Sequence, residues 1–115
     1  MRLRRFQYHE VDRVDEVLAL VQRYGEDLRI LAGGTALLLM IRYGIVSPAH
    51  VVSLHRIPAL RGIREDGDVI RIGALTSHAE IAGSEAGRRR CALLAAAVRR
   101  VATPAIRNMG TIGGN

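Results

Sequence analysis

Apolar positions in the first 25 residues change from the period of a strand to the period of a helix. Leu3 to Tyr8 alternates basic with apolar or aromatic residues and predicts a strand. A helix follows, with Asp12 as its expected N-cap and Gly25 as its expected stop. The helical spacing is carried by Val14, Val17, Leu18, Val21 and Tyr24.

The same alternation continues to residue 54. Leu28 to Ala32 is a short apolar segment that predicts a second strand, and the turn Gly33-Gly34-Thr35 follows it. The apolar run Ala36 to Tyr43 predicts a helix that ends at Gly44, and His50 to Leu54 predicts a third strand. The order β-α-β-α-β with short connections is typical of a small parallel sheet.

The pattern changes after Pro58. Ile63-Arg64 and Val69 to Ile72 flank Glu65-Asp66-Gly67-Asp68, which indicates a β-hairpin and the start of an antiparallel region. Ser77-His78-Ala79-Glu80 has the form of a capping box and predicts a short helix.

A longer helix is predicted from about Glu85 to Ala102, and Pro104 is expected to end it. Its expected inner face consists of Leu93, Leu94, Ala97, Val98 and Val101. Ile106-Arg107-Asn108 would then lead into a terminal glycine loop. We therefore expect an α+β fold, with an N-terminal lobe at 1–57 and the beginning of a second, incomplete lobe at 58–115.

Composition agrees with a folded chain of this size. The sequence has 115 residues, is 49% hydrophobic and carries a net charge of +6, with every basic residue an arginine. Arg88-Arg89-Arg90 with Arg99-Arg100 could contact nucleic acid, but the chain has only 3 Tyr and 1 Phe and no stacking motif. A solvated helix face is the better interpretation, and no nucleic-acid partner is expected.

Several classes of site are not supported by the sequence. The single cysteine, Cys91, excludes a disulfide framework and a cysteine-ligated iron–sulfur cluster held by these residues alone. The four histidines lack metal-ligand spacing, and no nucleophilic triad or general acid or base stands out. No secretory signal is present, and the apolar run from Ala36 to Ile41 is far shorter than the ~20 residues of a membrane helix. We therefore expect no catalytic residue, no metal site and no membrane insertion, and a soluble, cytoplasmic location.

Two glycine loops carry the chemistry that remains. Ala32-Gly33-Gly34-Thr35 joins a predicted strand to a helix expected to begin near Thr35, and Gly110 to Asn115 ends the sequence. Small residues let backbone N–H groups and the N-terminus of a helix approach a phosphate closely. The first loop matches neither G-x-G-x-x-G nor G-x-x-x-x-G-K-[ST]. If both serve one phosphate ester, the fold must bring distant segments together.

These segments resemble a known family. Ile30 to Leu38 and Ala102 to Asn115 are similar to the two FAD-binding signatures of the flavoprotein subunit of molybdenum hydroxylases, which include aerobic carbon monoxide dehydrogenase, xanthine dehydrogenase and 4-hydroxybenzoyl-CoA reductase. Pro48 to Leu54 and Ile72 to Ile81 resemble the family's intervening segments. The resemblance covers the whole chain but less than half of a typical member, so we expect an N-terminal fragment.

The resemblance implies a truncated FAD-binding fold of the vanillyl-alcohol-oxidase or PCMH type, in which both loops wrap the FAD pyrophosphate. Its site residues would be Ala32, Gly33, Gly34, Thr35, Ala36, Thr111, Ile112, Gly113, Gly114 and Asn115. Ala36 stands where relatives often have an acidic or polar residue, so it would contribute only its backbone. Arg42 stands where Lys is common and keeps the charge.

The resemblance also implies an electron-transfer role with partner chains. The molybdenum cofactor and the 2Fe-2S clusters would belong to two partner subunits, and FAD would exchange electrons with an external carrier. No His or Cys adjoins either glycine loop in the sequence, so noncovalent FAD is expected. For this fragment alone we expect weak FAD binding and self-association through the apolar side of its last long helix.

Two alternatives stay open at this point. One is a non-catalytic remnant that folds or pairs with another chain without holding a flavin. The other is a protein similar to FAD-dependent enolpyruvyl-glucosamine reductase, which shares the flavin fold and has a similar glycine loop.

Overall fold

The computed structural model describes residues 4–115. The chain divides into two compact units, the first ending at Pro58 and the second comprising Ala59–Asn115. Each unit has its own sheet and its own buried apolar residues.

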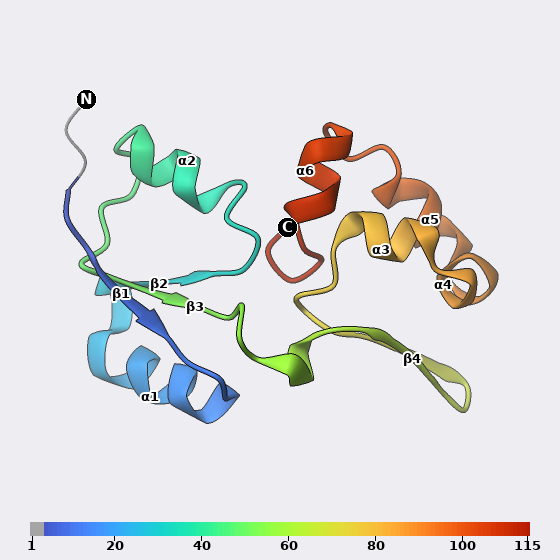
Figure 1. Ribbon diagram of the computed structural model, residues 1–115, viewed down its shortest axis with the longest axis horizontal. Coiled ribbons are helices and arrows are strands. Elements are labelled where there is room, and N and C mark those ends of the chain that lie inside the picture. The colour runs from blue at the N-terminus through green and yellow to red at the C-terminus, as the bar shows by residue number, and fades with distance from the viewer. Residues whose placement is uncertain (1–3) are drawn as a thin grey trace. The chain divides into compact units, whose positions relative to one another are not determined.

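The first unit contains a three-stranded parallel sheet (Figure 1). Its elements are β1 (Gln7–Glu10), α1 (Val14–Tyr24), the 3₁₀ turn Gly25–Asp27, β2 (Leu28–Leu31), α2 (Leu37–Arg42) and β3 (His50–Ser53). The strand order is β1-β3-β2, so the last strand in sequence lies in the middle. The predicted β-α-β-α-β order and parallel sheet are confirmed.

Both faces of this sheet are covered. The connection from β1 to β2 passes over β3, and the connection from β2 to β3 returns in the opposite direction. Because such crossovers are right-handed, the two helices must lie on opposite faces, and α1 and α2 do so in Figure 1. Val51 and Val52 point to opposite faces of β3 and are both fully buried, so they form the centre of the unit.

Two details at the start of the chain differ from prediction. The strand expected at Leu3 to Tyr8 begins at Gln7 and runs to Glu10, and Leu3 lies outside the described residues. Pairing with β3, from Gln7 opposite His50 to Glu10 opposite Ser53, decides this register, which alternation alone could not. Asp12 is not the N-cap of α1. Arg13 holds that position without a side-chain cap, whereas Gly25 ends the helix as expected.

The second unit consists of a hairpin and four short helices. Its elements are β4 (Ile63–Asp66), β5 (Val69–Ile72), α3 (His78–Gly83), α4 (Glu85–Arg90), α5 (Ala92–Val98) and α6 (Pro104–Met109); the 3₁₀ turn Pro58–Leu60 precedes β4 in sequence. The predicted hairpin is confirmed, with β4 and β5 antiparallel. The capping box is confirmed too, because Glu80 N–H donates to Ser77 Oγ (3.1 Å) and Ser77 N–H donates to Glu80 Oε1 (3.4 Å).

The single helix predicted from Glu85 to Ala102 is wrong. Cys91, at φ −137° and ψ 57°, separates α4 from α5. The break changes which side of the segment faces inward: Ala95 and Val98 are buried, Ala97 is exposed, and Leu93 is 86% exposed. A continuous helical period therefore placed Leu93 and Ala97 incorrectly on the inner face.

Pro104 begins a helix where it was expected to end one. It occupies the first turn of α6, and Thr103 Oγ1 accepts a hydrogen bond from Ile106 N–H (3.3 Å) as the N-cap. Proline is favoured there because the first helical N–H groups have no partner within the helix. Ile106-Arg107-Asn108 is therefore helical. The turn before it contains Ala102 at φ 43°, and Arg107 donates to its carbonyl oxygen (3.1 Å).

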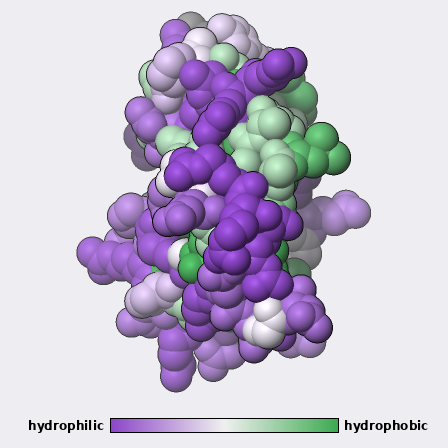
Figure 2. Space-filling model, turned by 90° about the vertical axis from the view of Figure 1, so that its right-hand side faces the viewer, coloured by the Kyte–Doolittle hydropathy of each residue, from purple (hydrophilic) through white to green (hydrophobic). Residues whose placement is uncertain are grey.

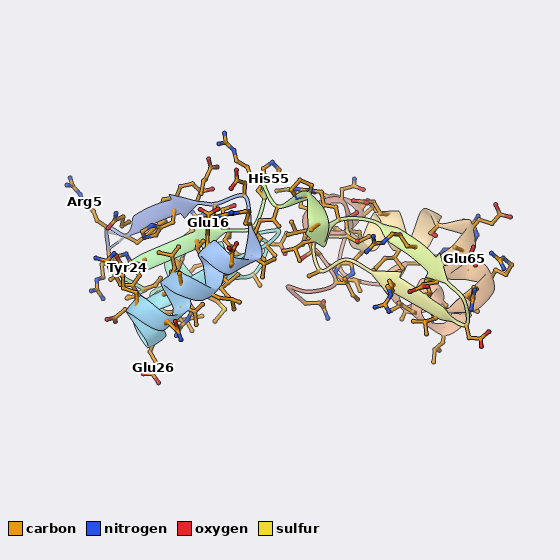
Figure 3. The ribbon with its side chains drawn as sticks, turned by 90° about the horizontal axis from the view of Figure 1, so that it is seen from below. Arg5, Glu16, Tyr24, Glu26, His55 and Glu65 are labelled. Carbon is orange, nitrogen blue, oxygen red and sulfur yellow. The ribbon has the colours of Figure 1, made fainter. Side chains whose placement is uncertain are left out.

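Two of the three consecutive arginines of α4 anchor the hairpin. Glu65 Oε1 of β4 accepts hydrogen bonds from Arg89 Nη2 (2.6 Å) and Arg90 Nη1 (3.3 Å), and Glu65 is labelled on the hairpin in Figure 3. The face of the molecule shown in Figure 2 is predominantly hydrophilic. Arg89 and Arg90 thus contact the hairpin of the same unit.

Among the described residues, no helix has the length and apolarity needed to cross a membrane.

Replacing Gly73 by alanine is expected to destabilise the second unit. An added Cβ would collide with the backbone carbonyl of Leu60 and lie 2.9 Å from Arg61 N, and neither is a flexible side-chain end. We expect the free energy of unfolding to fall by about 1–3 kcal/mol, as for overpacking of a rigid site. Denaturant titration of Gly73→Ala and of the control Gly83→Ala, whose Cβ would meet nothing within 4 Å, measures the difference. Equal stability of the two variants would contradict the expectation.

Candidate functional site

The first glycine loop lies where β2 ends and α2 has not yet begun. Gly34 adopts φ +81°, the left-handed region in which a side chain is strained. A Cβ at this position would also lie 3.2 Å from Leu38 Cδ1 and 3.3 Å from Leu31 Cδ1. The backbone conformation therefore requires glycine at position 34, and Leu31 and Leu38 leave little room for a side chain there.

This loop presents a run of unpaired backbone donors. Within residues 4–115, the N–H groups of Gly33, Gly34, Thr35 and Ala36 donate no hydrogen bond. The hydroxyl of the half-buried Thr35 also has no partner among these residues. Successive free N–H groups around a left-handed residue are typical of backbone anion sites. The loop can therefore accept an anionic oxygen.

The helix after the loop differs from expectation. It begins at Leu37, with Ala36 as its N-cap, and has only 6 residues. A dipole acts mainly through aligned peptides of a longer helix, so its contribution here is small. The unpaired N–H groups, rather than the helix, provide the attraction for an anion.

The second loop is held by a segment that was not among the predicted site residues. Residues 110–113 run antiparallel to residues 74–78, with Ser77 opposite Thr111. Three backbone hydrogen bonds join them: His78 N–H to Gly110 O (3.0 Å), Ile112 N–H to Thr76 O (2.9 Å) and Gly113 N–H to Ala74 O (2.9 Å). The resemblance of residues 72–81 to a family segment was the signal that could have identified this support.

Most N–H groups of the second loop are already engaged, unlike those of the first. Gly114 N–H donates to the hydroxyl of the buried Thr111 (3.2 Å), which closes the turn, and the N–H groups of Ile112 and Gly113 are held by residues 74–76. Gly113, Gly114 and Asn115 are exposed. Thr111 therefore shapes the loop, and Asn115 is the residue of this loop with polar groups at the surface.

The absence of a side chain at Gly113 allows the second loop to pack closely against Ala74. A Cβ at this position would lie 2.7 Å from Ala74 Cβ and 2.8 Å from Ala74 O, and its φ is not in the left-handed region. The loop can approach residues 74–76 closely only because position 113 has no side chain.

A histidine does lie beside the second loop, contrary to the expectation drawn from sequence neighbours. A Cβ on Gly110 would lie 3.2 Å from His78 Cδ2, and the His78 side chain is buried. Its Nδ1 has no hydrogen-bond partner among the described residues. Because the ring is enclosed, it cannot serve as an attachment point for a ligand at the surface of the loop.

The predicted site residues thus form two groups. Ala32, Gly33, Gly34, Thr35 and Ala36 belong to the first unit; Thr111, Ile112, Gly113, Gly114 and Asn115 belong to the second. Among the described residues, no group of three or more His, Cys, Asp or Glu side chains is placed to hold a metal ion. The free N–H groups of residues 33–36 and the Thr35 hydroxyl are the groups of the first loop that could bind an anion.

The sequence matches known proteins over almost all of its length. Residues 4–115 match the family described as "FAD binding domain in molybdopterin dehydrogenase". The carbon monoxide dehydrogenase medium chain of Hydrogenophaga pseudoflava is 43% identical over 111 residues, covering 96% of this chain and 39% of that protein. The 6-hydroxypseudooxynicotine dehydrogenase complex subunit alpha of Paenarthrobacter nicotinovorans is 37% identical over 110 residues, covering 96% of this chain and 37% of that protein.

A solved structure extends the comparison to the fold. A chain of carbon monoxide dehydrogenase from Hydrogenophaga pseudoflava, in a form that lacks the Mo-pyranopterin moiety of the molybdenum cofactor, superposes with a TM-score of 0.95 at 43% identity. The match covers 99% of this chain and 40% of that chain. The 115 residues therefore span about two fifths of the length of these relatives.

Proposed function

This chain belongs to the family of FAD-binding domains of molybdopterin dehydrogenases, and on that premise we propose that its two glycine loops bind the diphosphate of FAD. The subunit concerned would be the electron-transfer flavoprotein of a molybdenum-containing hydroxylase or dehydrogenase. The observation that carries the proposal is the run of unpaired N–H groups from Gly33 to Ala36.

The hydrogen-bond donors of the two loops suit the anionic oxygens of a diphosphate. FAD is anionic at its pyrophosphate, and charged acceptors form the stronger hydrogen bonds with N–H groups. Gly33, Gly34, Thr35 and Ala36 would hold one part of it through backbone N–H groups and the Thr35 hydroxyl. From the second loop, Asn115 would contribute its amide, while Thr111, Ile112, Gly113 and Gly114 would keep that loop in shape.

The residues of this chain would bind the cofactor, and the cofactor would supply the redox chemistry. FAD, when bound, accepts and donates electrons, so the protein need provide only binding, orientation and electrostatics. We propose that a molybdenum-cofactor subunit and a 2Fe-2S subunit are its partners, because relatives are named as a medium chain and as a subunit of a dehydrogenase complex. A cytoplasmic location is part of the same proposal.

The two alternatives are not favoured. A remnant without flavin would have no reason to keep four consecutive free N–H groups around a glycine in the left-handed region. A relationship to enolpyruvyl-glucosamine reductase is less well supported than the match of residues 4–115 to the molybdopterin dehydrogenase family.

The full-length protein is expected to carry one noncovalent FAD per chain. The His78 ring beside the second loop is buried, and no other His or Cys adjoins either loop in sequence, so acid precipitation should release all the yellow colour. Absorbance of the supernatant and the pellet measures the two fractions. Flavin retained by the pellet would show covalent attachment, and a colourless purified protein that cannot be reconstituted with FAD would contradict the proposed function.

A further inference from the structure

Two histidines that are 41 residues apart in sequence meet on the sheet of the first unit. His9 Nε2 lies 3.1 Å from His50 Nδ1, and both side chains are half-buried. His9 belongs to β1 and His50 to β3, which are adjacent parallel strands. His50 begins β3, whereas the first glycine loop follows the opposite, carboxyl-terminal end of β2. The pair is therefore separate from the proposed cofactor loop.

Neighbouring residues hold the two histidine rings in place. The ring of Tyr24 stacks on His50, with ring centroids 3.6 Å apart and an interplanar angle of 18°. Tyr24 is the last residue of α1 and is labelled in Figure 3. Pairing of Gln7 with His50 and of His9 with Val52 places both imidazoles on the same face of the sheet. Little side-chain ordering is then needed for the two rings to act together.

The spacing of the two nitrogens suits a shared metal ion. Imidazole binds zinc at about 2.0–2.1 Å, so two nitrogens 3.1 Å apart would subtend about 100° at the ion. That angle lies between the octahedral and tetrahedral values. We propose that His9 Nε2 and His50 Nδ1 form a bidentate site for a divalent transition ion that prefers imidazole, such as Zn²⁺ or Cu²⁺, with water completing the coordination.

Metal binding at this pair requires no net loss of protons. In the neutral pair, one ring donates its N–H to the other nitrogen. Binding needs a lone pair on both, so the donor ring moves its proton to its other nitrogen and becomes the opposite tautomer.

One neighbouring charge opposes a cation. Arg23 lies with its guanidinium carbon 5.2 Å from the centre of the Tyr24 ring that covers His50. No acidic side chain is hydrogen-bonded to the pair among the described residues. The site should therefore be of moderate affinity, and removal of this positive charge should strengthen it.

Zinc titration of the full-length flavoprotein by calorimetry tests the proposal. Wild-type protein should bind one more equivalent of Zn²⁺ than His9→Gln and than His50→Gln, because each single variant leaves only one imidazole. His55→Gln, which removes a histidine of the same unit outside the pair, should keep that equivalent. Arg23→Gln should bind Zn²⁺ more tightly than wild type.

A spectroscopic measurement on the wild-type protein tests the same site without depending on whether the histidine variants fold. With one equivalent of Cu²⁺, electron paramagnetic resonance should show coupling to two equatorial nitrogens. Retention of the zinc equivalent in either histidine variant, or copper coupled to a single nitrogen, would overturn the proposal. Loss of one equivalent of bound Zn²⁺ in both histidine variants, with FAD content unchanged, would support the proposal. It would also show that the metal site is separate from the proposed flavin site.

Discussion

Gly34→Val in the full-length protein is expected to lose FAD while the parallel sheet still forms. Valine resists φ +81°, and its branches would press on Leu31 and Leu38. The loop must then change conformation, and the N–H groups of residues 33–36 no longer point together. Loss of two charge-assisted hydrogen bonds, each worth about 1.5–3 kcal/mol, corresponds to an affinity decrease of at least about 100-fold. Flavin stoichiometry and fluorescence titration measure it.

Gly44→Val is the matched control for this experiment. Gly44 has a similar left-handed φ of +72°, but a Cβ there would meet nothing within 4 Å, and it lies beyond the far end of α2. The two variants should share the conformational cost, of the order of 1–2 kcal/mol in stability. Only Gly34→Val should lose FAD. Equal FAD binding by both variants would show that the first loop is an ordinary turn.

The first unit could be predicted from sequence because its local signals agree with its pairing. Leu28 to Leu31 and His50 to Ser53 are short apolar segments bounded by turn residues, and Gly25 stops the helix between the first two strands. The first strand was misplaced because Leu3 to Tyr8 carries the alternation, whereas Gln7 to Glu10 has one aromatic residue among three polar ones. Its register depends on hydrogen bonds to β3, which no local pattern contains.

The helices of the second unit were harder to predict because two signals were ambiguous. Glu85 to Ala102 has a nearly continuous helical period, and the break at Cys91 leaves no proline or glycine at that position. Thr103-Pro104 can end one helix or begin another, and the N-cap bond from Ile106 shows that here it begins α6.

The composition of the site was predictable, but the division of roles within it was not. Both glycine loops stand out as small-residue segments in the sequence. The structure shows that the first has free N–H groups, whereas in the second the N–H groups of Ile112, Gly113 and Gly114 are occupied. That difference depends on residues 74–76, which are more than 30 positions away from the loop they hold.

Gly113→Ala is expected to weaken FAD binding through the support of the second loop. The new Cβ would lie 2.7 Å from Ala74 Cβ and 2.8 Å from Ala74 O, so residues 113–115 must move away. The hydrogen bond from Gly113 N–H to Ala74 O would be lost, and Asn115 would be displaced with it. We expect an affinity decrease of about 100-fold, because displacement costs both the contact and the ordering of the loop. Fluorescence titration of the full-length protein with FAD measures it.

A compensating substitution tests whether the contact with the Ala74 side chain causes the loss of affinity. Ala74→Gly removes the nearer of the two clashes but keeps the carbonyl oxygen, so Ala74→Gly with Gly113→Ala should recover part of the lost affinity. Ala74→Gly alone should bind FAD nearly as wild type does, since the hydrogen bond from Gly113 uses only the backbone of residue 74. If the double variant binds FAD no better than Gly113→Ala, relief of the contact with the Ala74 side chain does not restore the loop, and that contact is not the cause of the loss. Partial recovery means that the glycine is needed for the loop to rest against residues 74–76.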